Sequence, residues 1–332
     1  MTVSPVVRET EHTITVPAPA DTVYDLIADA GRWPAIFTPT VHVQYLDTAP
    51  DGEERLRIWA FAGGGTDVRG WVSRRALDFE ARRVAFRQTE PAPPVAAMRG
   101  EWLVSPSGAE SSEVAFRHWF SAAGDDPGIL DKIEEVVDRN SRAELDSLRR
   151  AAAQRHRLAD LIVDFEDEVF IAAPARKVYD FLARAGDWPE LIPHVARVEL
   201  TEDAAGVQIL EMDTRESAGD PDRTEVHTTV SARVLLPPDS IVYKQTALPD
   251  FLSAHVGSWV LREDKRGVTA VARHTVVLKE EAITRVLGPG GTAAKAGDLV
   301  RRSIGANSVA TLRRARELTE GAEGAEGKES AR

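Results

Sequence analysis

An arginine and a serine on one strand face could polarise a ligand oxygen, and the sequence contains this pair twice. Ser73 and Arg75 are two residues apart, as are Ser231 and Arg233 in the second half. Side chains at this spacing on a β-strand point to the same face. If that face is concave, a guanidinium and a hydroxyl enter a cavity; if it is convex, both are solvated. A guanidinium in a water-poor cavity stabilises a carbonyl oxygen that gains negative charge.

A histidine also recurs at equivalent places among apolar residues. His118 alternates with Phe116 and Phe120, and His274 is its counterpart in the second half. Each imidazole is therefore expected to point inward with its apolar neighbours. Two interpretations stay open: a buried histidine held by one hydrogen bond, or a neutral imidazole that exchanges a proton with a bound ligand.

Aromatic and amide side chains complete the candidate site. An asparagine inside a helix and facing a dry core would be costly, so Asn140 and Asn307 either cap a local bend or face a polar cavity. Five of the seven tryptophans lie in the first half, which favours that half for stacking flat conjugated rings. The candidate substrate-binding residues are Trp33, Trp71, Trp102 and Asn140 in the first half and Trp188, Trp259 and Asn307 in the second. For Trp33 and Trp188, the simpler interpretation is an anchor in the core after the helix turn.

These residues recur because the chain repeats one domain. Residues 16–34 (VPAPADTVYDLIADAGRWP) match residues 171–189 (IAAPARKVYDFLARAGDWP) at eleven of nineteen positions. Weaker matches follow in the same order, which indicates two copies in tandem. We predict one domain at residues 1–156, a second at 157–319, and a disordered tail at 320–332, where small and charged residues cannot bury apolar area.

Each copy combines strands with one long helix. In the first copy, an alternating segment at residues 12–16 precedes a short helix ending at Gly31, and six more alternating segments follow between residues 41 and 122. Apolar residues then recur at helical spacing from Ile129 to Leu148. The second copy repeats this plan, with a break at residues 288–291 before its last helix. The pattern predicts tandem α+β domains, each a curved antiparallel sheet wrapped around its C-terminal helix.

Composition limits the partners and cofactors. The net charge of -12 argues against nucleic acid as a partner. The absence of cysteine excludes disulfides and thiolate metal sites. We expect a soluble, cytoplasmic protein, because there is neither a leader segment nor an apolar run that could span a membrane. No nucleotide-binding or metal-binding motif is present, so we expect no cofactor and no metal.

The repeated motifs resemble the polyketide aromatase/cyclases of bacterial type II aromatic polyketide synthases, members of the START-like helix-grip superfamily. The resemblance rests on Ala-Pro-x-x-x-Val-Tyr-Asp and Ala-Gly-x-Trp-Pro in both halves, on Trp-Val-Ser-Arg-Arg at residues 71–75, on a later tryptophan and on the long final helix. It covers both halves, as in the two-domain subclass. It implies an enzyme that folds a poly-β-ketone, closes the first ring by an intramolecular aldol reaction and removes water to make the ring aromatic.

The resemblance also implies partners, regiochemistry and residue roles. The substrate would arrive on an acyl carrier protein after a ketoreductase has reduced one ketone, and carbon seven would join carbon twelve. The family's second pocket arginine falls on Gln88 and Gln245, which the resemblance makes candidate substrate-binding residues. Its pocket tyrosine also falls on other residue types, and both departures indicate a substrate unlike that of the one-domain enzymes. The alternative is a non-catalytic helix-grip carrier for a lipid or an aromatic product. By position, the implied catalytic residues are Ser73, Arg75, His118, Ser231, Arg233 and His274.

Docking of an acidic carrier protein would require a local basic patch, because this chain is itself acidic. The candidates are the arginines after the first long helix and those in the second. The simpler interpretation is that these arginines occupy solvated helix faces near helix C-termini. The two clusters are Arg149, Arg150, Arg155 and His156, and Arg313, Arg314 and Arg316.

Overall fold

The structure is a computed structural model that describes residues 6–63, 67–124, 126–217 and 224–329. Its contacts divide the chain into two compact units between Ala159 and Asp160. No helix within the described ranges is both long enough and apolar enough to cross a membrane.

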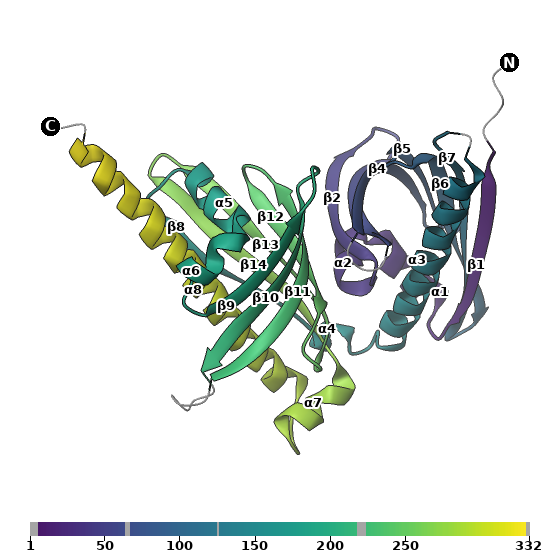
Figure 1. Cartoon of the computed structure of the whole chain (residues 1–332). Helices are drawn as coiled ribbons and strands as arrows, with labels where there is room; N and C mark the ends of the chain where they lie inside the picture. The colour runs from purple at the N-terminus through teal and green to yellow at the C-terminus, as the bar shows by residue number, and fades with distance from the viewer. Residues whose placement is uncertain (1–5, 64–66, 125, 218–223, 330–332) are drawn as a thin grey trace. The chain divides into compact units, whose positions relative to one another are not determined.

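The first unit is an antiparallel sheet that curves around one long helix (Figure 1). Its strands are β1 (Arg8–Val16), β2 (Thr40–Thr48), β3 (Glu54–Gly63), β4 (Asp67–Asp78), β5 (Arg83–Glu90), β6 (Val95–Gly108) and β7 (Ser111–Ala122). Its helices are α1 (Ala20–Ala28), the 3₁₀ turn η1 (Ala30–Arg32), α2 (Trp33–Ile36) and α3 (Pro127–Ala153). The strand order is β1-β7-β6-β5-β4-β3-β2, so the first strand pairs with the last.

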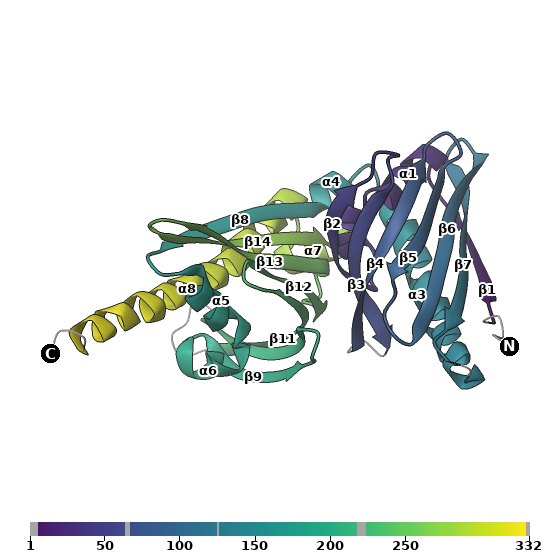
Figure 2. The ribbon, with the colours of Figure 1, turned by 90° about the horizontal axis from the view of Figure 1, so that it is seen from above.

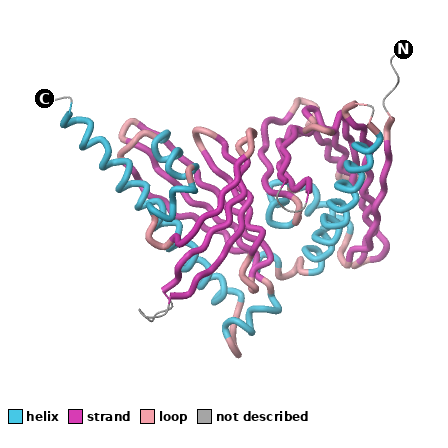
Figure 3. The backbone as a smooth tube through the Cα atoms, viewed as in Figure 1, coloured by secondary structure: helices cyan, strands magenta, loops and turns pink. Residues whose placement is uncertain are grey.

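The second unit repeats this architecture, and the same alternation of strands and helices is visible in Figure 3. A short helix α4 (Leu158–Leu161) leads into its first strand. The strands are β8 (Ile162–Ile171), β9 (Val195–Glu202), β10 (Val207–Ser217), β11 (Thr224–Leu236), β12 (Ser240–Ala247), β13 (Leu252–Asp264) and β14 (Gly267–Leu278). The helices are α5 (Ala175–Ala183), η2 (Ala185–Asp187), α6 (Trp188–Leu191), α7 (Glu280–Leu287) and α8 (Ala293–Glu329). The sheet order is β8-β14-β13-β12-β11-β10-β9.

The inward face of each long helix is apolar at its ends and polar near its middle. In α3, Ile133 and Val137 on one side and Leu145 and Leu148 on the other are buried at helical spacing, with the buried Ser141 between them. In Figure 2, α3 runs along one face of its sheet. The second unit shows the same arrangement, because Ser308 is buried between Val300 and Leu312 of α8. The apolar ends pack on the sheet, and the serine marks the part of each helix that faces a cavity.

The predicted tandem α+β architecture is confirmed, while the last helix differs from the expectation in its extent. The predicted break is present, since α7 ends at Leu287 and Gly288 adopts a φ of 76°, which favours glycine. However, α8 continues as helix to Glu329, through most of the tail predicted to be disordered; residues 330–332 lie outside the described residues. Alanine and glutamate favour helix, and lengthening an existing helix avoids the cost of nucleation.

One glycine in each sheet lets an aromatic ring lie across the neighbouring strand. A Cβ atom at Gly100 of β6 would lie 2.4 Å from Phe86 Cζ, and a Cβ atom at Gly257 of β13 would lie 2.4 Å from Tyr243 Oη. Each glycine pairs with the histidine singled out in the sequence, His118 in β7 and His274 in β14. Glycine in a strand interior is expected where another group approaches the backbone this closely.

Candidate functional site

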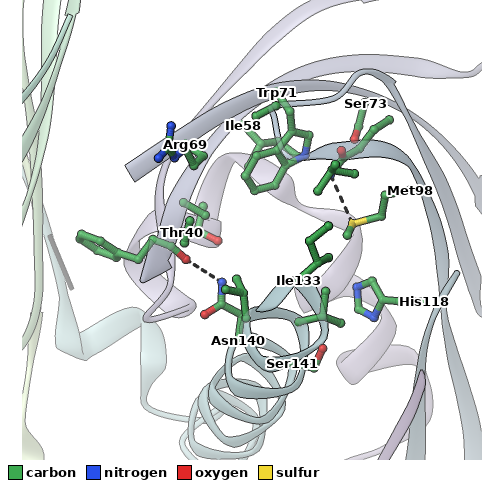
Figure 4. A pocket seen from close by; sticks show the side chains of 18 of the residues that line it. Thr40, Ile58, Arg69, Trp71, Ser73, Met98, His118, Ile133, Asn140 and Ser141 are labelled. Atoms are coloured by element: carbon green, nitrogen blue, oxygen red, sulfur yellow. Dashed lines mark hydrogen bonds between the residues drawn. The ribbon is translucent and has the colours of Figure 1, made fainter. Parts of the chain in front are cut away.

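A pocket lies between the sheet and the long helix in each unit. The volume is about 300 Å³ in the first unit and about 420 Å³ in the second, within the range of small-molecule sites. In Figure 4, Trp71 and Ser73 lie on the sheet side of the first pocket, and Asn140 lies on the helix side. Seven phenylalanine, tryptophan or tyrosine residues line the first pocket and four line the second.

All of the candidate residues predicted from the sequence line one of these pockets. Their catalytic and binding roles remain predictions. The first pocket contains Trp33, Trp71, Ser73, Arg75, Gln88, Trp102, His118 and Asn140. The second contains Trp188, Ser231, Arg233, Gln245, Trp259, His274 and Asn307.

Arg75 of β4 is buried in the first pocket with its charge neutralised. Its side chain is 2% exposed and lies 2.7 Å from the Glu54 carboxylate on the paired strand β3. Nε donates to the same carboxylate at 2.7 Å, and Nη2 donates to the carbonyl oxygen of Ala28 at the end of α1, at 2.6 Å. The guanidinium carbon also lies 5.4 Å from the centre of the Trp33 ring. Arg75 therefore connects the sheet to the helices that close one end of the pocket.

Arg233 occupies the same place in the second pocket, but its immediate partners are neutral. It donates to Gln208 Oε1 at 2.8 Å and to the carbonyl oxygen of Leu182 at 2.6 Å. Its guanidinium carbon lies 5.2 Å from the centre of the Trp188 ring. Burial lowers the pKa of Arg233 to about 10, so the group is still charged at neutral pH. Among the described residues, no carboxylate forms an ion pair with Arg233, although Glu202, which accepts a hydrogen bond from Gln208 at 2.8 Å, also acts on its charge.

Polar atoms in the first pocket lack protein partners. Within the described ranges, Ser73 Oγ, Gln88 Oε1 and His118 Nδ1 are buried without a hydrogen bond. Burial lowers the pKa of His118 to about 3, with a smaller contribution from His12, so its imidazole is neutral at physiological pH. Buried polar groups are normally hydrogen-bonded, and these atoms are therefore suited to hydroxyl or carbonyl groups of a ligand.

Aromatic rings surround the polar groups of the first pocket. Trp102 stacks on Phe116 with ring centres 3.5 Å apart and an interplanar angle of 15°. Phe116 in turn lies 4.2 Å from the His118 ring. Asn140 Nδ2 donates to the carbonyl oxygen of Phe61 at 2.7 Å, which links α3 to β3. These contacts produce a rigid apolar wall that suits a flat, conjugated ligand.

Polar side chains in the second pocket are connected to one another. His274 Nε2 lies 3.0 Å from Ser308 Oγ, and His274 Nδ1 lies 3.1 Å from His255 Nε2. His255 Nδ1 lies 2.9 Å from Gln245 Oε1, and Tyr243 Oη lies 3.1 Å from His274 Nδ1. Burial, together with the mutual effect of the two rings, lowers the pKa of His255 to about 3. Burial and Arg301 lower that of His274 to about 4.

Sequence reasoning missed several residues of the two sites. His255 carries a usable signal: it precedes Trp259 by four residues on β13, and period-two alternation places both on one face. Tyr243 likewise precedes Gln245 by two residues on β12. Ser308 lies directly after Asn307 and is visible as a polar residue within the apolar face of α8. Glu54 and Gln208 lie on neighbouring strands and could be found only from strand register.

Most of the arginines proposed for carrier docking have partners within their own unit. Arg149 pairs with Asp146 at 2.8 Å, and Arg155 pairs with Glu110. Arg314 donates to the carbonyl oxygen of Leu191 at 2.7 Å. Over the described ranges, no group of three or more histidine, aspartate or glutamate side chains is arranged to hold a metal ion.

Two family models with the same description match the chain, one in each half. Residues 8–153 and residues 171–300 each match a model described as polyketide cyclase/dehydrase and lipid transport. The chain is 43% identical to the granaticin polyketide synthase bifunctional cyclase/dehydratase of Streptomyces violaceoruber, over 96% of both chains. It is 42% identical to the actinorhodin polyketide synthase bifunctional cyclase/dehydratase of Streptomyces coelicolor, over 92% of this chain and 94% of that one.

Two solved structures share the whole two-unit architecture. The di-domain ARO/CYC BexL from the BE-7585A biosynthetic pathway is 45% identical, with a TM-score of 0.80 over 94% of this chain and 99% of that chain. The di-domain ARO/CYC StfQ from the steffimycin biosynthetic pathway is 37% identical, with a TM-score of 0.80 over 95% and 99% of the two chains.

Proposed function

This chain belongs to the polyketide cyclase/dehydrase family and is an enzyme that cyclises and dehydrates, and from that premise we propose its substrate and product. The substrate is a poly-β-ketone tethered to an acyl carrier protein, with one ketone already reduced by a ketoreductase. The enzyme joins carbon seven to carbon twelve by an intramolecular aldol reaction and removes water, which leaves an aromatic first ring. The proposed setting is the cytoplasm.

The observation that carries this proposal is the buried set of arginine, serine and histidine in each apolar pocket. An aldol reaction requires one ketone oxygen that gains negative charge and one methylene that loses a proton. Arg75 and Arg233 line these pockets, and a guanidinium in a water-poor site can stabilise such an oxygen. The imidazoles of His118 and His274 are neutral and can accept a proton, while Ser73 and Ser231 can hydrogen-bond a carbonyl group. The enclosed walls keep a reactive chain in one folded arrangement.

The partners follow from the chemistry of the proposed substrate. Poly-β-ketones are reactive and are best delivered on a carrier, and the relatives are named as parts of polyketide synthases. A pocket of about 300 Å³ accepts part of such a chain and one forming ring. Candidate substrate-binding groups are the tryptophans and amides that line the two pockets.

Reconstitution with a minimal synthase, a carrier protein and a ketoreductase tests the proposal. With the enzyme present, we expect a first-ring aromatic product closed between carbons seven and twelve to replace spontaneous products. Isotope-labelled acetate units read by NMR would establish which carbons are joined. An unchanged product profile would favour the alternative, a carrier for an aromatic product. A different ring closure would retain the cyclase and overturn the regiochemistry.

A further inference from the structure

The second pocket contains a continuous hydrogen-bonded chain of side chains from one helix and three strands. It connects Ser308 of α8, His274 of β14, His255 of β13 and Gln245 of β12. His255 and His274 are each 3% exposed. A chain of this kind is costly to bury unless each member is satisfied, and here each member has a partner.

The direction of donation follows from one atom that can only accept. With its amide oxygen facing His255, Gln245 accepts a hydrogen bond from His255 Nδ1. His255 Nε2 then lacks a proton and accepts from His274 Nδ1. His274 Nε2 therefore accepts from the Ser308 hydroxyl. Both rings are neutral at physiological pH, because burial holds the pKa of each at or below about 4. The Ser308 hydroxyl is therefore hydrogen-bonded to the His274 imidazole, and the hydrogen bond from His274 to His255 fixes the tautomer of that imidazole.

The first pocket lacks this chain although its histidine occupies the same place. Strand pairing aligns His118 with Gly100 and His274 with Gly257, so Phe86 corresponds to Tyr243. Met98 precedes Gly100 by two residues and His255 precedes Gly257 by two, so Met98 occupies the position of His255. Neither phenylalanine nor a thioether can hold the histidine in one tautomer as the second pocket does. His118 Nδ1 is accordingly buried without a partner among the described residues.

Arg233 adds an independent observation that points to the same pocket. Removing a proton next to a ketone places negative charge on the ketone oxygen, which a guanidinium stabilises most when it is not already paired. Arg75 has Glu54 at 2.7 Å, whereas Arg233 has the neutral Gln208 at the equivalent position. The second pocket therefore combines an arginine without a carboxylate partner, among the described residues, with an imidazole held in one tautomer, whereas the arginine of the first pocket is paired with Glu54.

We propose that the second pocket is the dehydration centre, in which His274 and Ser308 transfer the proton and His255 and Gln245 are positioning residues. This inference rests on the proposed function and divides its two steps between the pockets. The first pocket has an aromatic wall and polar atoms without protein partners among the described residues, and it folds the poly-β-ketone and closes the ring. The second converts the resulting β-hydroxy ketone into the unsaturated ring.

The step balances without any co-reactant. The carbon–hydrogen bond next to the ketone breaks, its proton goes to Ser308 Oγ, and the serine's own proton passes to His274 Nε2. The electron pair forms the new carbon–carbon double bond as the bond from carbon to the hydroxyl oxygen breaks. His274 returns its proton through Ser308 to the leaving hydroxyl, which departs as water. Serine and imidazole end as they began, and Arg233 stabilises the transient negative charge on the ketone oxygen.

Variants of the full chain test the division by measuring which product accumulates. His255→Met installs the residue found at the equivalent place in the first pocket. We expect the rate of dehydration to fall at least about tenfold while ring closure continues, so that the cyclised hydroxy ketone accumulates. His255→Gln offers an amide that can accept from His274 and donate to Gln245, so it should restore most of the rate. If His255 contributed only packing, the dehydration rate of His255→Gln would not exceed that of His255→Met.

Ser308→Ala provides a second route to the same question if His255→Met fails to fold. It should also accumulate the cyclised hydroxy ketone. Thr275→Ala is the matched control, because Thr275 follows His274 on the opposite face of β14, where it donates to Asp164. The control should keep the wild-type ratio of hydroxylated to aromatic product.

Each outcome separates this inference from the proposed function. Wild-type product ratios in both His255→Met and Ser308→Ala would overturn the dehydration centre and leave the cyclase intact. Loss of ring closure together with dehydration in these variants would also overturn the division. If wild-type enzyme itself leaves the product profile unchanged, the proposed function fails first.

Discussion

The two pockets share one framework and differ in the polar groups that it carries. In each, an arginine, a serine and a histidine enter from equivalent strands, and a serine interrupts the apolar face of the long helix. The first pocket pairs its arginine with a carboxylate and surrounds its histidine with aromatic rings. The second leaves the arginine unpaired by a carboxylate, within the described part of the chain, and connects its histidine to a second one.

This difference shows how little of a fold must change to alter its chemistry. It arises at inward-facing positions on adjacent strands, so the backbone and the core need not move. The exchanged pairs are Glu54 and Gln208, Trp71 and Thr229, Phe86 and Tyr243, and Met98 and His255. The following experiments test whether the two pockets differ in function as they differ in composition.

Removing the charge of Arg233 should have the largest effect. Arg233→Met is expected to lower turnover to aromatic product on the order of a hundredfold, as the loss of one group that stabilises a developing oxyanion does elsewhere. Arg75→Met should lower turnover less, because Glu54 already neutralises that guanidinium. Steady-state rates for both variants and for the charge-retaining Arg233→Lys would measure the difference. Equal losses in Arg75→Met and Arg233→Met would contradict it.

Acid should destabilise the histidine pair of the second pocket. The pKa values of His255 and His274 in the folded state are about 3 and about 4, below the value of about 6.5 in an unfolded chain. Stability is therefore full above pH 6.5 and is lost as the pH falls toward 4, because the unfolded state binds more protons. Each histidine contributes about 2 kcal/mol to this loss between pH 7 and pH 5.

Urea unfolding of wild type and His255→Met at pH 7 and pH 5 would measure the part of this stability loss that His255 contributes. The variant should lose about 2 kcal/mol less free energy of unfolding between the two values, because one titrating group is gone. Thr275→Ala should behave as wild type. An identical pH dependence in wild type and His255→Met would show that His255 does not stay neutral in the folded protein.

Exchanging an aromatic residue should affect the first pocket through binding. Trp71→Thr installs the residue that lines the second pocket at the equivalent place, Thr229. Losing one stacking surface costs about 1 kcal/mol, so KM for carrier-bound substrate should rise about fivefold with a smaller change in kcat. The reciprocal Thr229→Trp serves as the comparison. A fall in kcat at unchanged KM would assign Trp71 to the chemical step instead.

Reversing a basic cluster should have the smallest effect. Arg149→Glu with Arg150→Glu is expected to raise KM for an acidic carrier protein about threefold at low salt, and the effect should fade at moderate salt. The control is Lys265→Glu with Arg266→Glu, which makes the same charge change at exposed residues of the second unit. An equal rise in both variants would mean that net charge, and not a local surface, governs docking.

Sequence reasoning succeeded where one strand or helix carried the signal. Period-two spacing placed Ser73 and Arg75 on one face, and the repeat extended the inference to Ser231 and Arg233; all four line pockets. It could not show what these groups contact. The carboxylate beside Arg75 and the imidazole beside His274 come from neighbouring strands, and pairing register is set by the whole sheet. The extent of the last helix was also missed, because composition alone does not show when a helix already formed will continue.

The absence of a side chain at Gly257 determines where the Tyr243 hydroxyl lies in the second pocket. Its missing side chain leaves the space in which Tyr243 lies across the strand, with its hydroxyl 3.1 Å from His274. A single methyl group there would displace the phenol without altering any charge or any hydrogen-bonding group. The position of a hydroxyl group beside His274 thus depends on a residue that has no functional group. Efforts to redirect ring formation in this scaffold can adjust reactivity by volume alone, at a strand position that carries no reactive group.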